Sequence, residues 1–522
     1  MKNPIVSLNQ TAALLLAAAV VELFPGVQIV EGCGNSKYFY YDFLFPFEFK
    51  SDFLPLIEER IRLILREKRA FRSMEMMPSN AAMLMKHQHQ RIAAEKLMQT
   101  QKATVQMVQI GDFALFCPLH PLESLAIPFF KILEGFSLIT SELKATRIVG
   151  IASVDKEKLK EIAKQPIPSL QSHLTLVQEM GLCAPMNELG MWYWCPKGEC
   201  LRQQLLALWQ DLLVKENFEL IASPNSFIDD GGEESIRQSH WEYFSRFGSP
   251  KIAEMALILN EDFKDSSYGL LSPKAIFGDR VHLFCPEEKL LEECISSLPF
   301  ILKIPKILGF EFEIVLSVSS EGAQKTKARG SGLLRQVLEK ADLNYTIEKE
   351  YRAGTIASID VRFIDCLGRS WTGPYLSLPD VAMPPGKSRM LALSTFGSLE
   401  RTCALILEKN AGWLPLWLAP QQVRILVANN NADPYANKVY EALSDQGIRV
   451  ALDSSAEKLK TRLYRAVVEK VPYVLLLGER EEKAKILTIR AYGESEEQIL
   501  SLDEFCMRLK KEIESGNSEF KN

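Results

Sequence analysis

The sequence has no excess of positive charge and no close pairs of cysteine residues. Its 61 Lys and Arg residues are outnumbered by 66 Asp and Glu residues, which gives a formal net charge of −5. Such a chain has no general basic field, so any contact with nucleic acid must come from a local patch. The ten cysteines are too scattered for a disulfide scaffold or a regular zinc framework, and they favour a reducing compartment such as the cytoplasm.

The sequence also lacks a long hydrophobic run, internal repeats and any low-complexity tract other than the polar tail after Ser515. Its apolar run from Ala12 to Val21 is closed by Glu22 and has a single lysine before it. A run of this length is too short to span a bilayer. We therefore expect a buried helix here and no contact with a membrane.

What the chain does have is enough apolar and charged residues for several ordinary domains. Of its 522 residues, 47% are hydrophobic and 24% are charged, which suits two to four domains with their own cores. The segment Gln165–Ser169 contains two prolines that break a helix, so it predicts a linker. We divide the chain into residues 1–164, a linker at 165–172, a central part at 173–413 and a last part at 414–522.

Hydrophobic periodicity predicts a multidomain α+β and α/β protein. In the central part, leucines at helical spacing predict a helix over Cys200–Phe218. Apolar and β-branched runs at Phe310–Val318 and Ile359–Ile364 predict strands of a large antiparallel sheet. The last part predicts a small βαβ-type sheet covered by helices. Its expected elements are strands at 423–428, 449–452 and 473–477 and helices at 435–446 and 457–469.

Two short motifs identify a family that the chain resembles. The string Gly397-Ser398-Leu399-Glu400-Arg401 places a polar face at the start of a helix, and Pro415–Pro420 leads from that helix into the last part. Together they resemble the third signature motif of threonyl-tRNA synthetase and the junction with that family's anticodon-binding domain. The resemblance extends over nearly the whole chain. It implies an editing-like domain, then a class II synthetase core with an antiparallel sheet, then an anticodon-binding-like α/β domain.

The first part resembles the editing domain of bacterial-type threonyl-tRNA synthetases, in which two histidines on a helix face a Cys/His pair. The matching helix is Leu8–Pro25, where Gln10 and Leu14 occupy the histidine positions. Leucine can neither bind a metal nor exchange a proton. Cys117 and His120 remain, so we expect an editing remnant without efficient editing. Family members usually begin with a small ubiquitin-like domain, and we expect none here, because the editing-like helix lies at the start of the sequence.

The stretch from Gly190 through Gly198 to Pro224 resembles the family's motif 1, which builds the dimer interface of class II synthetases. Its retention implies a homodimer with Pro224 at the interface, and it says little about catalysis. The string Gln238-Ser239-His240-Trp241 then resembles a short turn that follows motif 1 in the family.

The resemblance implies that the family's catalytic zinc is lost. Only 16 residues lie between Tyr243 and Asn260, where the family has a longer segment that contains a cysteine ligand. The two histidine ligands fall on His282, which remains, and on Ala392, which cannot bind a metal. A catalytic zinc needs three protein ligands and an open position. We therefore expect no zinc and no recognition of threonine through a metal.

The resemblance also implies the loss of adenylation chemistry. The motif 2 arginine, which would hold the ATP α-phosphate, is replaced by Leu259. A glutamine and an aspartate of the family become Gly278 and Arg280, and Arg280 reverses the charge of a position that would receive the substrate ammonium. The family's Tyr-Gly-Pro-Lys becomes Thr355–Ser358, and a later glutamine becomes Ser377. No catalytic set is intact.

Three residues of motif 3 remain: Ser398, Glu400 and Arg401. In the family the matching arginine contacts the ATP γ-phosphate, so Arg401 is a candidate for a residual ATP contact, and ATP is the only cofactor left open. The alternative is structural: the motif forms a helix start in which Arg401 is paired with a carboxylate.

In the last part, Lys458, Lys460, Arg462 and Arg465 place positive charge on one predicted helix. This helix could lie along an RNA backbone, or it could be a solvated face. Compared with the family's anticodon-facing surface, Ser455 replaces an arginine and Arg465 replaces a glutamate, so reading of a threonine anticodon is in question.

Taken together, the residues favour a catalytically degenerate pseudo-synthetase in the cytoplasm that binds tRNA or a protein partner without forming threonyl-adenylate. Two alternatives remain open: an active threonine-tRNA ligase with a rebuilt site, and a small-ligand sensor. We favour the pseudo-synthetase because the polar site positions are replaced together, whereas the apolar positions of the family's core persist.

Overall fold

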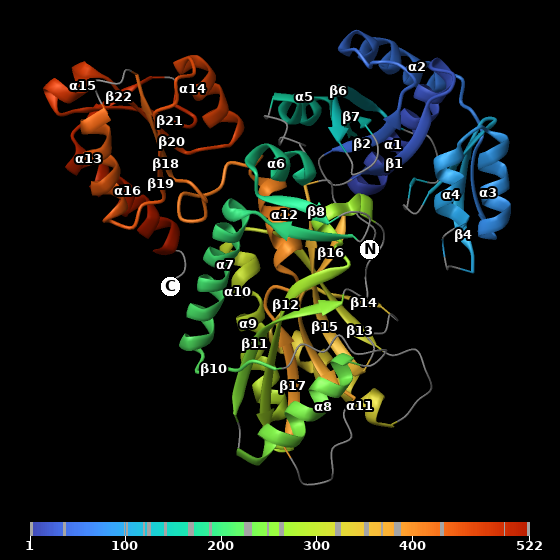
Figure 1. Cartoon of the computed structure of the whole chain (residues 1–522). Helices are drawn as coiled ribbons and strands as arrows, with labels where there is room; N and C mark the ends of the chain where they lie inside the picture. The colour runs from blue at the N-terminus through green and yellow to red at the C-terminus, as the bar shows by residue number, and fades with distance from the viewer. Residues whose placement is uncertain are drawn as a thin grey trace. The chain divides into compact units, whose positions relative to one another are not determined.

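The structure is a computed structural model. The chain divides into two compact units, residues 1–175 with 365–369 and residues 176–364 with 370–522. Figure 1 shows the elements along the chain. The expected linker at 165–172 lies outside the described residues except for Ser172. The central and last parts share the second unit, so their separation stays a prediction. The described residues are 4–34, 38–98, 100, 103–117, 121–122, 127–139, 144–164, 172–186, 190–223, 232–247, 250–259, 266–318, 325–348, 354–366, 369–380, 388–428, 433–494 and 496–518.

The first unit contains a four-stranded antiparallel sheet in the order β1-β2-β7-β6 and a three-stranded sheet in the order β3-β4-β5. Helix α1 packs on the first sheet and supplies much of the core. The elements of this unit are α1 (Pro4–Leu23), β1 (Gln28–Gly34), β2 (Phe39–Leu44), α2 (Leu54–Arg66), β3 (Phe71–Met76), α3 (Pro78–His87), α4 (Arg91–Met98), β4 (Val105–Ile110), β5 (Phe113–Phe116), β6 (Phe129–Ile139), β7 (Lys144–Ser153) and α5 (Lys156–Lys164), and α6 (His173–Met180) crosses the boundary.

Helix α1 is longer than its apolar run suggested. Its 19 residues from Ile5 to Leu23 have a mean hydropathy of 1.6, so by length and composition the helix could cross a membrane. The expectation that this segment is too short for a bilayer was therefore wrong. Its side chains from Ala12 to Val20 are almost fully buried against β1, β2, β7 and α2, as expected for the core helix of a folded unit.

The main feature of the second unit is an eight-stranded sheet in the order β10-β11-β12-β17-β16-β15-β13-β14, antiparallel except where β10 pairs with β11 and β13 with β14. Its elements up to residue 409 are β8 (Cys183–Met186), β9 (Met191–Trp194), α7 (Pro196–Lys215), β10 (Glu219–Leu220), α8 (Gly232–Phe244), β11 (Lys251–Leu259), β12 (Ala275–Cys285), α9 (Leu290–Ile301), α10 (Lys303–Ile307), β13 (Glu311–Val318), α11 (Lys325–Lys340), β14 (Thr346–Glu348), β15 (Thr355–Ile364), β16 (Ser370–Pro379), β17 (Arg389–Ser394) and α12 (Leu399–Lys409).

The two faces of this sheet are covered by different helices. Helices α9 and α11 pack on one face, together with side chains such as Leu391 and Leu393 of β17. Helix α8 packs on the other face, where Trp241 contacts Phe284 and Met390. Successive residues of a strand point to opposite faces, so Ala392 lies on the α8 face.

The last part of the chain forms a five-stranded sheet in the order β19-β18-β20-β21-β22, in which the first three strands are parallel. Helices α13 and α16 pack on one face of this sheet and α14 packs on the other (Figure 1). The expected small α/β sheet is confirmed. Its elements are β18 (Val423–Val427), α13 (Asp433–Ser444), β19 (Val450–Asp453), α14 (Leu459–Val468), β20 (Tyr473–Leu477), α15 (Glu479–Ala484), β21 (Leu487–Ala491), β22 (Gln498–Leu500) and α16 (Leu502–Ser518).

Most expected elements are present, with shifted ends and one change of type. Helix α7 begins at Pro196, four residues before the expected start, because proline suits the first turn of a helix. Strand β15 begins at Thr355 and not at Ile359. The string Gln238–Trp241, expected to be a turn, lies inside helix α8.

Candidate functional site

Four strands bring the polar positions of the expected active site together in one row. His282 of β12 is directly opposite Ala392 of β17, which is opposite Ser377 of β16, which is opposite Ser358 of β15. Residues directly opposite each other point to the same face, with Cβ atoms roughly 5 Å apart. We call these four residues the sheet-face row. The four positions that the resemblance to the family identified are thus neighbours in the sheet.

The sheet-face row contains one imidazole and three small side chains, all of them buried. The Ser377 hydroxyl donates to the Ala392 carbonyl at 3.2 Å. Among the residues that the structure describes, no group of three or more His, Cys, Asp or Glu side chains could hold a metal ion. His282 alone does not fit zinc, which needs three protein ligands.

Helix α8 supplies a partner for His282 that the sequence did not suggest. The His240 Nδ1 atom lies 3.0 Å from His282 Nδ1, and the other ring nitrogen of His240 lies 2.6 Å from the Ser223 hydroxyl. Burial lowers the pKa of His282 well below its usual value, and nearby His240 lowers it further. His282 is therefore neutral at physiological pH, and its hydrogen bond is made within the protein.

Arg280, at the position where the family has an acid, is buried and paired. Its Nη1 atom lies 2.9 Å from Glu254 Oε1, and the two residues are cross-strand neighbours on β12 and β11. The other carboxylate oxygen of Glu254 accepts the backbone N–H of Ser223 at 2.6 Å. The positive charge of Arg280 is thus compensated inside the sheet by a residue that the sequence reasoning did not consider.

Asp279, next to Arg280, joins the sheet to the segment that precedes α12. One carboxylate oxygen accepts the Ser394 hydroxyl at 2.5 Å and the Phe396 backbone N–H at 3.2 Å. The other accepts the Thr395 hydroxyl at 2.8 Å, the Thr395 backbone N–H at 2.6 Å and the indole N–H of Trp209 at 3.3 Å. Five donors on one buried carboxylate are typical of a structural anchor.

The motif 3 residues form the buried start of α12. Ser398 is the N-cap residue, and its side chain accepts the backbone N–H of Arg401 at 3.2 Å. The Glu400 carboxylate accepts the Phe277 backbone N–H at 3.0 Å and the Ser398 hydroxyl at 3.1 Å. Burial raises the pKa of Glu400 to about 7. All three side chains are nearly inaccessible to solvent.

Arg401 is held by oxygen atoms of the protein. Its Nε atom donates to the Leu271 carbonyl at 2.7 Å, and its Nη1 atom donates to the Thr372 carbonyl at 2.5 Å and to the Thr372 hydroxyl. These partners are carbonyl and hydroxyl groups, and the ion pair with a carboxylate that the structural alternative expects stays a prediction. An ATP contact through Nε or Nη1 would require these atoms to exchange their hydrogen bonds.

Two glycines allow the start of α12 to approach the sheet closely. Gly397 has a φ of 75°, and a Cβ atom there would lie 2.7 Å from the carbonyl oxygen of Gly373. A Cβ atom on Gly278 would lie 2.9 Å from the Ile258 Cδ1 atom and 3.1 Å from the carbonyl oxygen of Gly397. The glutamine that the family has at this position would not fit without movement of the chain.

Leu259, at the position of the motif 2 arginine, is the last residue of β11 and 62% of it is exposed. An isobutyl side chain there supplies no donor for a phosphate. Pro224, expected at the dimer interface, lies outside the described residues.

In the first unit, Gln10 and Leu14 lie one turn apart on α1, and Leu14 is 1% exposed. Cys117 is fully buried after β5. The structure places this thiol in the core, where a cysteine acts as a small apolar residue. His120 lies outside the described residues, so the proximity of the Cys/His pair stays a prediction.

The four cations of the last part do not form one exposed surface. Lys458 and Lys460 are exposed at the start of α14, and Arg465 forms an ion pair with Glu457. Arg462 is 4% exposed and donates to the carbonyls of Val427 at 2.7 Å and Asp453 at 3.0 Å. The expectation that Arg462 faces RNA is therefore wrong, because its guanidinium is used inside the domain.

Glu400 should make the stability of the second unit depend on pH. Its folded pKa of about 7 exceeds the ordinary value of 4.5, so the stabilising contribution of its protonated form is present below pH 4.5 and is lost as pH rises to 7. The shift corresponds to about 3 kcal/mol. We expect Glu400→Gln, relative to the parent chain, to gain up to about 3 kcal/mol of unfolding free energy between pH 5 and pH 8. Urea unfolding of both proteins at pH 5 and pH 8 tests this. If the difference in unfolding free energy between the variant and the parent chain were the same at both pH values, Glu400 would already be ionised at pH 5.

Comparisons with known proteins agree with the family assignment from the motifs. The family described as Anticodon binding domain matches residues 422–512. The threonine–tRNA ligase of Clostridium botulinum (strain Hall) is 26% identical, over 98% of this chain and 89% of the relative. The threonine–tRNA ligase of Clostridium novyi is also 26% identical, over 97% and 88%.

Solved structures show the same fold. The RNA binding domain of threonyl-tRNA synthetase from Cryptosporidium parvum superimposes with a TM-score of 0.57 at 22% identity, covering 65% of this chain and 98% of that one. A putative threonyl-tRNA synthetase from Aeropyrum pernix has a TM-score of 0.52 at 14% identity, covering 67% and 97%. The chain is therefore similar in sequence and fold to aminoacyl-tRNA synthetases, and its residues 422–512 match an anticodon-binding family. More specifically, the chain is threonyl-tRNA synthetase-like.

Proposed function

We propose that this protein is a pseudo-synthetase, which binds tRNA through a retained synthetase frame and does not form threonyl-adenylate. The observation that carries the proposal is the buried ion pair between Arg280 and Glu254. Through the resemblance, position 280 is where an acid would receive the substrate ammonium. A guanidinium takes the place of that acid, and the neighbouring Glu254 carboxylate is already engaged by Arg280 and by the Ser223 backbone N–H.

The other positions support the same proposal. Adenylation requires cations that stabilise the charge of the α-phosphate as the threonine carboxylate attacks it. Leu259 supplies no charge, and Arg401 donates to the Leu271 and Thr372 carbonyls. A side chain at position 278 would require the Ile258 side chain and the Gly397 carbonyl to move. The sheet and the helix that would orient ATP and threonine are in place. Of the cations that would act on the phosphate, one position is Leu259 and the other, Arg401, is bonded to the protein.

Binding of tRNA is supported by the match of residues 422–512 to an anticodon-binding family and by the exposed Lys458 and Lys460. These two ammonium groups stand at the start of α14, where they are available for phosphate oxygens. We further propose a homodimer without zinc, since motif 1 is retained and His282 alone cannot hold the metal.

Threonine-dependent ATP–pyrophosphate exchange on purified, metal-analysed protein tests the catalytic half of the proposal. We expect no exchange above background and no stoichiometric zinc. Exchange with bound zinc would favour the alternative, an active ligase with a rebuilt site, for which the retention of Ser398, Glu400 and Arg401 is the supporting observation.

A binding measurement with bulk tRNA tests the other half independently. We expect affinity to fall when Lys458 and Lys460 are both replaced by glutamine, with a weaker dependence on salt because fewer counterions are released. Lys438→Gln is the matched control, because this exposed lysine lies on α13, on the opposite face of the same sheet. Absence of tRNA binding, or an equal loss in the control, would contradict an RNA contact through α14.

A further inference from the structure

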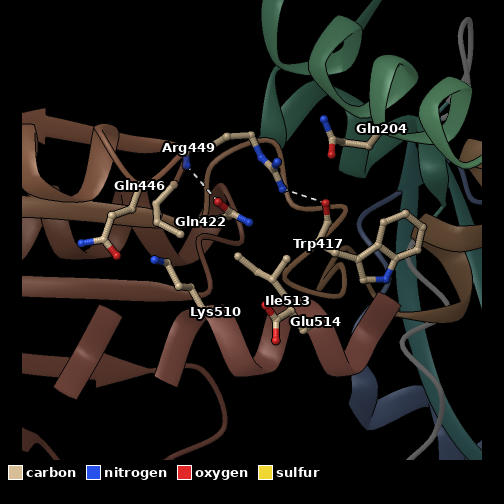
Figure 2. Close-up of a pocket in the computed structure, with 10 residues that line it drawn as sticks. Gln204, Trp417, Gln422, Gln446, Arg449, Lys510, Ile513 and Glu514 are labelled. Carbon is tan, nitrogen blue, oxygen red and sulfur yellow. Dashed lines mark hydrogen bonds between the residues drawn. The ribbon is translucent and has the colours of Figure 1, made fainter. Parts of the chain in front are cut away.

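The second unit contains a cavity that shares no residue with the sheet-face row or with α14. Its volume is about 370 Å³, within the range of small-molecule sites. The walls come from the segment before β18, from the turn between α13 and β19, from α16, and from Gln204 of α7 (Figure 2).

One wall of the cavity is fixed by a part-buried hydrogen-bond network. Arg449 donates from Nη2 to the Trp417 carbonyl at 2.7 Å and from Nε to the Ala419 carbonyl at 2.8 Å. The Gln422 side chain accepts the Arg449 backbone N–H at 2.8 Å and donates to the Leu416 carbonyl at 2.9 Å. The wall is therefore formed before any ligand arrives, which lowers the entropic cost of binding.

The opposite wall carries two charges of opposite sign. Lys510 and Glu514 are both exposed and lie four residues apart on α16, so they occupy one face of the helix. Figure 2 draws both side chains on α16 together with Ile513. Within the part of the chain that the structure describes, no ion pair or hydrogen bond engages either side chain or the Gln204 amide.

The remaining wall is apolar. Ile448 is buried, Ile513 is half-buried, and the half-buried indole of Trp417 completes this side. An ammonium and a carboxylate one helical turn apart, beside an apolar surface, complement a molecule that has both charges and an apolar group. Glu514 would repel a polyanion, and an uncharged ligand would form no ion pair with either side chain.

We propose that this cavity binds a free α-amino acid. The ligand carboxylate meets Lys510, the ligand ammonium meets Glu514, and the ligand side chain packs on Ile448, Ile513 and Trp417. The proposal does not depend on the proposed function, because the two sites have no residue in common.

The test uses the full chain and each of the twenty L-amino acids, added singly in ligand-observed NMR and then in calorimetric titrations. We expect saturable binding of at least one of them. Its N-acetyl derivative, which has no ammonium, and its carboxamide, which has no carboxylate, should each bind at least ten-fold more weakly.

Lys510→Gln and Glu514→Gln remove one charge each from exposed positions, and we expect each to weaken binding about ten-fold. Lys511→Gln is the matched control, because Lys511 is exposed on the same helix and does not line the cavity. Circular dichroism checks that all three variants fold. The proposal is overturned if none of the amino acids binds, if both charge variants bind like the control, or if inorganic phosphate competes as well as the amino acid does.

Discussion

Asp279→Ala is expected to destabilise the second unit by about 4 kcal/mol, because it leaves five buried donors without their acceptor. Two of these donors are backbone N–H groups of Thr395 and Phe396, which cannot turn toward another partner. The hydroxyls of Ser394 and Thr395 can rotate, which limits the loss. All seven tryptophans lie at or beyond Trp192, so tryptophan fluorescence during urea unfolding reports on this unit alone.

Asp279→Asn and Ser394→Ala are the graded controls for this experiment. Asparagine keeps one acceptor oxygen but turns an NH₂ group toward donors, so we expect a loss between that of alanine and the parent chain. Ser394→Ala removes one donor to Asp279 and also the acceptor of the Gly397 backbone N–H, so it should cost about 1 to 2 kcal/mol. If Asp279→Ala cost no more than Ser394→Ala, the carboxylate would not be the anchor between the sheet and α12.

Breaking the pair of Arg280 and Glu254 from one side is the second substitution with a large effect. Glu254→Gln removes the carboxylate that pairs with the guanidinium at a position only 6% exposed, and we expect a loss of about 3 to 5 kcal/mol. Arg280→Met leaves the Glu254 carboxylate buried and should cost about as much. The measurement is again urea unfolding followed by tryptophan fluorescence.

The double variant Arg280→Met with Glu254→Gln measures the interaction energy between the two side chains, apart from the contribution of each side chain alone. It removes both charges, so its loss should be smaller than either single loss, with a coupling of 2 kcal/mol or more, on the order seen for buried networks. Additive losses would mean that the two side chains do not compensate each other. The pseudo-synthetase proposal would then lose its main support.

The fold was largely predictable from the sequence because its elements carry strong local patterns. The leucines of α7 and the apolar strands β18 and β20 are buried as their periodicity indicates. Correspondence with the family also selected His282, Ala392, Ser377 and Ser358, which the antiparallel register places in one row. Strand register depends on residues far apart in the sequence, and local patterns do not predict it. The sheet-face row could therefore be predicted only through the resemblance to the family.

The partners of the polar side chains were not predictable. Glu254 lies 26 residues from Arg280 along the chain, and His240 lies 42 residues from His282. No local pattern marks such pairs, although Glu254 within the apolar strand β11 was a charged residue that needed a partner. The burial of Arg462 was unpredictable for a related reason. The sequence shows four cations near one helix, but it does not show that three backbone carbonyls accept hydrogen bonds from Arg462.

The close contact between Gly278 and the Gly397 carbonyl has a consequence for evolution. A glutamine restored at position 278 alone would meet Ile258 and the start of α12, so it would destabilise the protein before it could help to bind a substrate. The same holds for Arg280→Asp, which would place two carboxylates side by side with Glu254. Each of these single replacements would therefore give a less stable protein. Under the proposed function, packing at these two positions would oppose a return to synthetase chemistry, because each single replacement costs stability before the other is in place.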